Sequence, residues 1–110
     1  MRSPMPVPAK RKSRSISVSY SLAFKEEALR EWKKLDSNVC DQFKKKLEER
    51  LLNPRVPASK LSGHNDRFKI KLRSVGYRLV YEVRDNELIV VVVAVGKRER
   101  NAVYKAAAKR

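Results

Sequence analysis

The stretch RFKIKLRSVGYRLVYEVRDNELIVVVVAV, residues 67–95, decides the fold, because it contains three consecutive segments with the patterns of β-strands. In residues 67–73, apolar and cationic side chains alternate strictly, which places the two kinds on opposite faces of a strand. Short turns at 74–76 and at Asp85–Asn86 separate this strand from YRLVYEVR and from ELIVVVVAV. The last run is apolar on both faces, which predicts a central strand covered on one side by helices. Together the three segments predict an antiparallel meander.

One strand and two helices are predicted before this meander. The segment SVSYSLAF, residues 17–24, alternates polar and apolar residues and predicts a first strand. Residues 25–35, KEEALREWKKL, have apolar side chains at helical spacing and predict the first helix. Asp36 and Ser37 then interrupt the pattern and are suitable caps for a second helix, which Pro54 ends. The apolar residues of the second helix recur every four positions: Val39, Phe43, Leu47 and Leu51.

The remaining segments complete the order of elements. Residues 55–66 show neither period and are expected to form a loop. Gly96 is expected to end the last strand, and the alanine-rich segment from Arg98 to Arg110 predicts a short helix. The predicted order is β-α-α-β-β-β-α. This order belongs to the α+β class, with an antiparallel-dominated four-stranded sheet, a helical hairpin on one face and a short C-terminal helix.

The charge of the chain indicates a polyanionic partner. Among 110 residues, 27 are Lys or Arg and 12 are Asp or Glu, which gives a formal charge of +15. A chain of this length fits a single domain. Residues 1–16 contain basic residues, prolines and serines but few large apolar residues, so we expect a disordered basic tail. The folded domain is then expected to span residues 17–110.

Several functional classes are excluded by what the chain contains. The longest apolar stretch, residues 88–95, is far shorter than the roughly 20 residues that a membrane-spanning helix needs. One cysteine, Cys40, and one histidine, His64, cannot supply the ligands of a zinc site. Three glycines leave no glycine-rich phosphate loop. We therefore expect no metal and no cofactor.

The basic face of the predicted sheet is the candidate site. Lys69, Lys71 and Arg73 share one face of their strand, and Arg78 follows on the next strand. An ordinary solvated strand face, or protection of a sheet edge by cations, would give the same pattern. The net charge and the cations after the last strand favour a phosphate-binding face instead.

Such a face has the chemistry for cutting RNA without a metal, because RNA supplies its own nucleophile, the 2′-hydroxyl. A lysine among other cations has a lowered pKa, which favours its use as a base. Arginine remains charged and binds the non-bridging oxygens of a phosphate in pairs. A tyrosine nearby has the means to stack on a base or to transfer a proton. The side chains that would form this site are Lys69, Lys71, Arg78, Arg98 and Tyr104.

Three blocks of the sequence resemble the RelE family of bacterial toxins: ALREWKKL, FKIKLRSVGYRLVYEV and VGKRERNAVY. The similarity extends over about residues 19–110 and implies a small RelE-like fold. It implies a ribosome-dependent endonuclease that cleaves mRNA in the A site and inhibits translation. It also implies a cytoplasmic protein, paired with a RelB-type antitoxin through which the complex binds operator DNA.

The resemblance also implies roles for individual residues. Lys69 and Lys71 would activate the 2′-hydroxyl and stabilise the phosphate, and Arg78 would hold the phosphate. Arg98 would aid the leaving oxygen, and Tyr104 would stack on the mRNA base or share in proton transfer. Arg73, Lys97 and Arg100 would bind mRNA or 16S ribosomal RNA of the 70S ribosome. Which residue is the acid and which is the base stays open.

The sequence departs from the family pattern in two places. The tail of residues 1–16 is absent from the usual short members, and Ser62 stands where close relatives carry a basic residue.

Two other functions are alternatives to the endonuclease. The first alternative function is that of a ParE-like toxin, which shares the fold and inhibits DNA gyrase without nuclease activity. The complete set of five site residues favours the endonuclease over the ParE-like toxin. The second alternative is a basic ribosome-associated or DNA-binding protein in which no single residue matters greatly.

Overall fold

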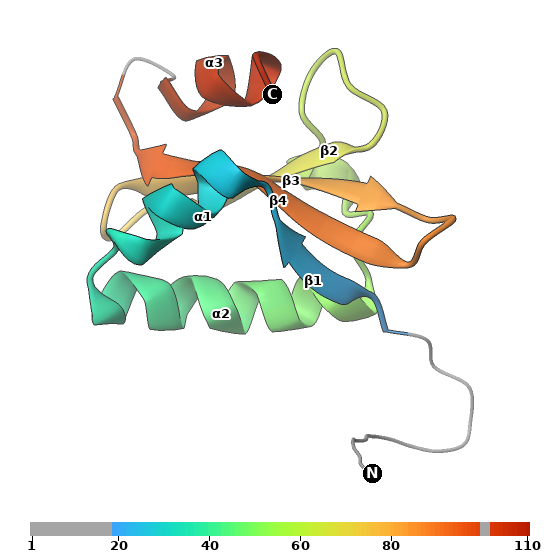
Figure 1. Ribbon diagram of the computed structural model, residues 1–110, viewed down its shortest axis with the longest axis horizontal. Helices are drawn as coiled ribbons and strands as arrows, with labels where there is room; N and C mark the ends of the chain where they lie inside the picture. The colour runs from blue at the N-terminus through green and yellow to red at the C-terminus, as the bar shows by residue number, and fades with distance from the viewer. Residues whose placement is uncertain (1–18, 100–101) are drawn as a thin grey trace, which may run out of the picture.

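The computed structural model describes residues 19–99 and 102–110, and its centre is a four-stranded sheet (Figure 1). The strands are β1 (Ser21–Phe24), β2 (Arg67–Leu72), β3 (Tyr77–Arg84) and β4 (Ile89–Lys97). Their order across the sheet is β1-β4-β3-β2, with β1 parallel to β4 and the other two pairs antiparallel. The predicted order of elements, the antiparallel-dominated sheet and the central position of the last strand are therefore confirmed.

Helices α1 (Glu26–Lys33) and α2 (Ser37–Leu52) form the predicted hairpin on one face of the sheet. The side chain of Asp36 accepts a hydrogen bond from the main-chain N–H of Asn38, which caps the start of α2 as predicted. Val39, Phe43 and Leu47 are buried on the inner side of α2. They share one core with the apolar residues of β2, as the alternation in that strand requires: Phe68, Ile70 and Leu72.

The opposite face of the sheet is covered by α3 (Ala102–Ala108), as Figure 1 shows. Val103 and Ala107 of α3 are buried against a second, smaller core. The residues of the sheet in this core are Val80, Val93 and Ala94. The predicted helical hairpin therefore covers one face of β4, and β4 is apolar on both faces because α3 covers the other.

Two predicted boundaries differ from the structure. Gly96 does not end the last strand, because β4 continues to Lys97 and Gly96 lies opposite Arg78 on β3. Among the residues that the structure describes, the first strand begins at Ser21, and Ser21–Phe24 pair with β4. Residues 17 and 18, like the predicted tail of residues 1–16, lie outside the described residues.

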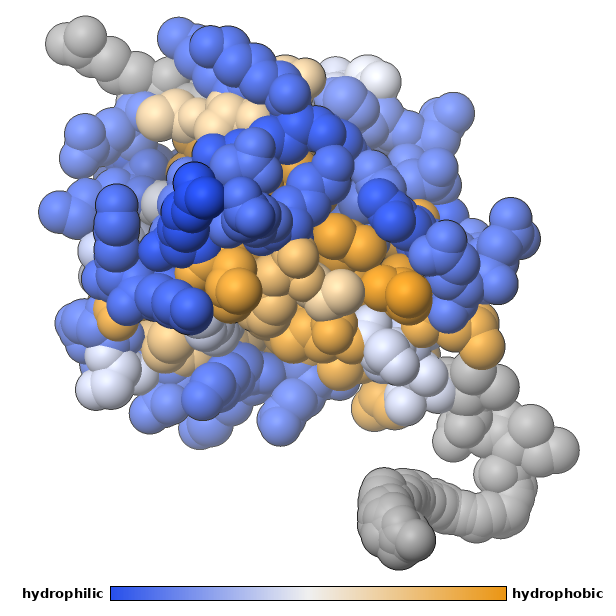
Figure 2. All heavy atoms as spheres, in the orientation of Figure 1, coloured by the Kyte–Doolittle hydropathy of each residue, from blue (hydrophilic) through white to orange (hydrophobic). Residues whose placement is uncertain are grey.

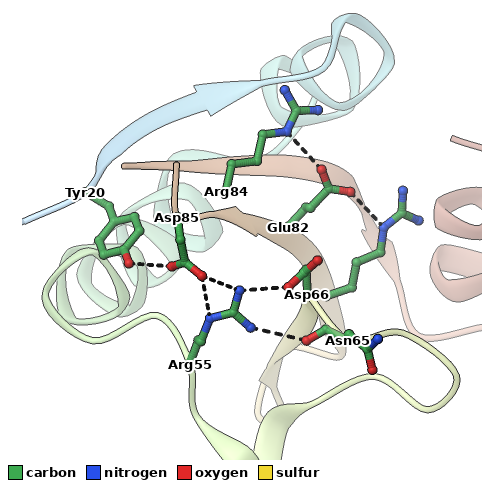
Figure 3. A network of polar contacts seen from close by, with 8 residues as sticks. Tyr20, Arg55, Asn65, Asp66, Glu82, Arg84 and Asp85 are labelled. Carbon is green, nitrogen blue, oxygen red and sulfur yellow. Dashed lines mark hydrogen bonds and ion pairs between the residues drawn. The ribbon is translucent and has the colours of Figure 1, made fainter. Parts of the chain in front are cut away.

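The predicted loop of residues 55–66 contains one short 3-10 turn, Pro57–Ser59, and is fastened to the sheet by Arg55 (Figure 3). The Arg55 guanidinium donates hydrogen bonds to Asp85 at 2.7 and 3.1 Å and to Asp66 at 2.7 Å. Asp85 also accepts a hydrogen bond of 2.6 Å from the hydroxyl of Tyr20. We call Tyr20, Arg55, Asp66 and Asp85 the polar clip. It joins the entry to β1, the loop and the hairpin between β3 and β4.

Candidate functional site

The register of β2 and β3 places the predicted cations on the face of the sheet that α3 covers. Lys71 lies opposite Arg78, and Lys69 lies opposite Val80. Residues that are directly opposite in an antiparallel pair point to the same side of the sheet. Because Val80 packs under α3, Lys69, Lys71 and Arg78 lie on that same face. The alternation in the sequence is therefore reproduced by the structure, with the apolar residues of β2 on the other side.

Tyr104 of α3 reaches this cationic face. Its hydroxyl accepts a hydrogen bond of 3.1 Å from Nη1 of Arg78, and the Arg78 guanidinium lies 5.5 Å from the centre of its ring. The ammonium of Lys69 lies 6.0 Å from the same ring centre. Cations at these distances are attracted to the negative face of an aromatic ring. Two of the predicted catalytic cations, Lys69 and Arg78, are thus grouped around the ring of a third predicted residue, Tyr104.

Lys71 and Arg98, the other two, meet in an adjoining hollow of about 250 Å³. The main-chain N–H of Arg98 donates a hydrogen bond of 2.7 Å to the carbonyl of Gly76, which ties the end of β4 to the turn between β2 and β3. The Arg98 side chain is exposed at this point. Four cations line the hollow: Lys71, Arg73, Arg78 and Arg98. The structure therefore brings the five predicted catalytic residues and Arg73 into one continuous surface.

The cations of this surface change one another's properties. The positive charge of Lys69 is the largest cause of a lowered pKa for Lys71, followed by partial loss of water and by the charges of Arg78 and Arg73. Like charges favour the neutral form of an amine. A lysine with a lowered pKa is a better base near neutral pH than an isolated one. The surrounding arginines stay charged and provide strong, paired hydrogen bonds to phosphate oxygens.

Lys97, one of the residues predicted to bind RNA, is not on this surface. It lies opposite Tyr77 and lines a different hollow beside α1, together with Glu31 and Lys34. The reason is a β-bulge: Val80 pairs with Ala94 and Tyr81 with Val92, so Val93 is an extra residue in β4. An extra residue reverses the faces of every position after it. Arg100, also predicted to bind RNA, lies outside the described residues.

Three residues that line the hollow were not predicted as site residues from the sequence: Leu72, Gly76 and Tyr77. Gly76 has a φ of +70°, a conformation that glycine adopts without the steric cost that other residues bear. The segment Gly76-Tyr77-Arg78 is the sequence feature that could have indicated Gly76 and Tyr77 as site residues. It places a tight turn and an aromatic residue directly before the predicted cation Arg78.

Residues 19–99 and 102–110 contain neither a metal-binding cluster nor a membrane-spanning helix. In these residues, no three His, Cys, Asp or Glu side chains lie close enough together to hold a metal ion. No helix within the same residues is both long enough and apolar enough to span a membrane.

Comparisons with known proteins agree with this geometry. The family described as ParE toxin of type II toxin-antitoxin system, parDE, matches residues 22–102. The mRNA interferase toxin RelE of Escherichia coli K12 is 57% identical over 93 residues, which cover 84% of this chain and 98% of that protein. A mutant of E. coli toxin RelE in the free state has a TM-score of 0.78 at 55% identity, covering 84% of this chain and 97% of that one. The intact E. coli RelBE toxin-antitoxin complex has a chain with a TM-score of 0.72 at 57% identity, covering 74% of this chain and 100% of that one.

Proposed function

This chain belongs to the RelE/ParE family of toxins of type II toxin–antitoxin systems, and we propose that it is an mRNA interferase that cleaves mRNA in the ribosomal A site. The observation that carries this proposal is 57% identity to an mRNA interferase over 84% of the chain. The cationic surface supports it, because Lys69, Lys71, Arg78, Arg98 and Tyr104 adjoin one another there. Because ribosomes translate mRNA in the cytoplasm, we propose that the protein acts there.

The geometry supports a separate role for each of these residues in the reaction. Cleavage forms a bond between the 2′-oxygen and phosphorus and breaks the bond between phosphorus and the 5′-oxygen. Lys71, whose pKa is lowered, would accept the proton of the 2′-hydroxyl, assisted by Lys69. Arg78, in the hollow, would hold the non-bridging oxygens as negative charge develops on them.

The leaving group and the mRNA base would be served by the other two residues. Arg98 is exposed at the hollow, where its guanidinium would stabilise the 5′-oxygen as the bond to phosphorus breaks. Tyr104 accepts a hydrogen bond from Arg78, so its own O–H remains available to donate. Its ring would stack on the base. The 5′-oxygen would take its proton from the Tyr104 hydroxyl, which solvent then reprotonates, so the products are a 2′,3′-cyclic phosphate and a free 5′-hydroxyl.

The site is a hollow lined by cations that would bind the phosphate, and the alignment of the reacting atoms would come from the ribosome. In-line attack requires the 2′-oxygen, the phosphorus and the 5′-oxygen to lie on one line. Correct alignment of reacting groups lowers the activation free energy by roughly 7–11 kcal/mol in well-oriented cases. Lys71, Arg73, Arg78 and Arg98 line the hollow and would surround the phosphate with positive charge. The ribosome would supply that alignment by fixing the mRNA in the A site.

A ParE-like toxin without nuclease activity remains the second candidate, because the matching family description bears that name. The curated relatives favour cleavage, since two of them, from E. coli K12 and Shigella flexneri, are mRNA interferases at 57% identity. Complete retention of the five-residue set favours the same conclusion.

The proposed partner is a RelB-type antitoxin, because E. coli RelE is found with RelB in a toxin–antitoxin complex. The surface of this chain also has apolar area for a protein partner. Figure 2 shows hydrophobic residues gathered across the middle of one face, and Leu22 of the edge strand β1 and Leu88 near it are 40% and 44% exposed. We propose that the complex binds operator DNA through the antitoxin.

The test of the proposed function uses one labelled mRNA in two states. Purified protein is incubated with the mRNA either free in solution or bound to programmed ribosomes, and the cuts are mapped by primer extension. We expect cuts within A-site codons on ribosomes and little cleavage of free mRNA. Efficient cleavage of free mRNA would contradict ribosome dependence, and intact mRNA in both states together with inhibited gyrase would favour the ParE-like alternative.

A further inference from the structure

The end of α3 that follows Tyr104 is held by donors from other elements. Arg67, the first residue of β2, donates from Nη1 to the carbonyl of Ala107 at 2.6 Å. Lys25, the residue before α1, donates from Nζ to the main-chain oxygen of Arg110 at 2.7 Å. Carbonyls in the last turn of a helix have no partner within the helix, and cations there also complement the helix dipole. The contact of Arg67 therefore stabilises the last turn of α3, and that of Lys25 holds the residue two positions beyond the helix.

Arg110 itself is bound to the carboxylate of Glu31 on α1. Its two terminal nitrogens donate to Oε1 and Oε2 of Glu31 at 2.8 and 3.2 Å. Nη1 also donates to the carbonyl of Val93 at 3.0 Å, and Oε1 of Glu31 accepts the main-chain N–H of Val95 at 3.1 Å. A paired interaction of this kind, with side chains only 16% and 31% exposed, is stronger than an exposed ion pair. Glu31 thus joins α1, β4 and the end of α3.

Apolar packing alone gives α3 a weak hold on the sheet. The helix has seven residues, which is too short for a helix to be stable by itself. Its buried side chains, Val103 and Ala107, are small and remove little apolar surface from water. The polar contacts at its end therefore add to this packing in fixing where the helix lies. Tyr104 lies on this helix between the two buried residues, so its hydroxyl reaches Arg78 only when the helix is in place.

We propose that the Glu31–Arg110 ion pair is a positioning device for Tyr104, an inference that rests on the proposed mRNA cleavage. Neither residue lines the cationic hollow of Lys71, Arg78 and Arg98. The pair acts by holding the end of α3 against α1 and β4. Removing it leaves the cationic surface of β2 and β3 unchanged and lets Tyr104 move away from Arg78.

The first experiment compares Arg110→Ala with a matched control, Lys109→Ala, which removes the same charge from the neighbouring exposed residue. Single-turnover cleavage is measured over a range of programmed-ribosome concentrations. We expect Arg110→Ala to lower the rate at saturation by roughly 10-fold, because small misplacements of a catalytic group are costly. The ribosome concentration at half-saturation should stay unchanged. Arg110→Lys should recover part of the rate, and Lys109→Ala should cleave like the unmodified chain.

A double-variant cycle separates positioning from a general loss of stability. In a Tyr104→Ala background the side chain that the ion pair positions is absent. Adding Arg110→Ala to this background should therefore change the remaining cleavage rate less than twofold. A pair that acts only through stability would lower the rate by the same factor in both backgrounds. That result would overturn the proposal, as would equal rates for Arg110→Ala and Lys109→Ala.

A measurement without ribosomes keeps this proposal distinct from the proposed function. Amide hydrogen exchange of α3, followed by NMR, should be faster in Arg110→Ala than in Lys109→Ala, while exchange in β3 stays the same. Unchanged exchange in α3 would overturn the proposal even if cleavage fell. If the unmodified chain left ribosome-bound mRNA intact, the proposed function would fail, and exchange alone would decide whether the ion pair holds the helix.

Discussion

A β-carbon at Gly96 would lie 3.2 Å from Cγ2 of Val103, so the bare backbone at this position of β4 sets how closely α3 approaches the sheet. Gly96 lies opposite Arg78 in the sheet, and Arg78 donates its hydrogen bond to Tyr104 of α3. The close approach at Gly96 therefore brings the helix that carries Tyr104 within reach of the strand that carries Arg78.

Gly96→Ala should move α3 outward by a few tenths of an ångström, because the added methyl group crowds Val103. Overpacking of this kind costs about 1 kcal/mol of unfolding free energy. The cleavage rate should fall as the contact between Tyr104 and Arg78 lengthens. Urea denaturation and single-turnover cleavage on ribosomes measure the two effects. The double variant Gly96→Ala/Val103→Ala should cleave faster than Gly96→Ala alone, and unchanged cleavage in the single variant would show that the close approach is dispensable.

Arg98→Ala should leave folding nearly intact and lower cleavage strongly. The side chain is exposed, and the hydrogen bond to Gly76 comes from the main chain, so stability should change by less than about 0.5 kcal/mol. Losing a charge that stabilises the leaving oxygen should lower the single-turnover rate by roughly 100-fold.

The control for Arg98→Ala is Lys44→Ala, which removes one exposed charge from α2, on the other face of the sheet. This variant should show only a small, salt-dependent loss of ribosome affinity. Equal losses of cleavage in the two variants, accounted for by weaker ribosome binding, would mean that Arg98 contributes charge alone and has no catalytic role.

Lys69→Gln should raise the pKa of Lys71, because the charge of Lys69 is the main cause of the lowered value. A base acts in its neutral form, so the cleavage rate of the unmodified chain should rise with pH toward the pKa of Lys71. NMR titration of the Lys71 side chain in both proteins measures the shift directly. If the titration of Lys71 were the same in Lys69→Gln, coupling between the two lysines would be absent.

Asp85→Asn should destabilise the fold at neutral pH and lose this effect in acid. The hydrogen bond from Tyr20 is the largest cause of a lowered pKa for Asp85, followed by that from Arg55. A carboxyl group whose pKa is lower in the folded state stabilises the fold above its unfolded pKa. That contribution is lost as the pH falls through the folded pKa. Melting temperatures of the two proteins should therefore differ at pH 7 and converge in strong acid. A difference independent of pH would show that the charge of Asp85 is not responsible.

Much of the site was predictable from the sequence because strand periodicity is local. The alternation in residues 67–73 fixes which side chains of β2 face the core, so Lys69 and Lys71 had to share the other face. The four-residue spacing of apolar residues in α2, with Asp36 as its cap, was equally decisive for the helix. Such patterns can be recognised without knowing which residues lie on the neighbouring strands or helices.

The bulge in β4 is a feature that the alternation of residues did not predict. Strict alternation from Val92 would put Lys97 on the same face as Val93, under α3, and Gly96 on the other. The extra residue reverses both, so Lys97 lies beside α1 and Gly96 lies under Val103. A bulge depends on how two strands pair, and no single segment of the sequence specifies that.

The sequence by itself determined the order of the elements, the core-facing residues of β2 and α2 and the cationic character of one face of the sheet, because each follows from spacing along the chain. The tertiary structure alone decided that Tyr104 meets Arg78 and Lys69 and that Arg98 reaches the hollow of Lys71. It also decided that Glu31 holds Arg110, a residue 79 positions away in the chain. These contacts depend on where helices and strands dock, and docking is set by complementary surfaces and charges brought together only when the chain has folded.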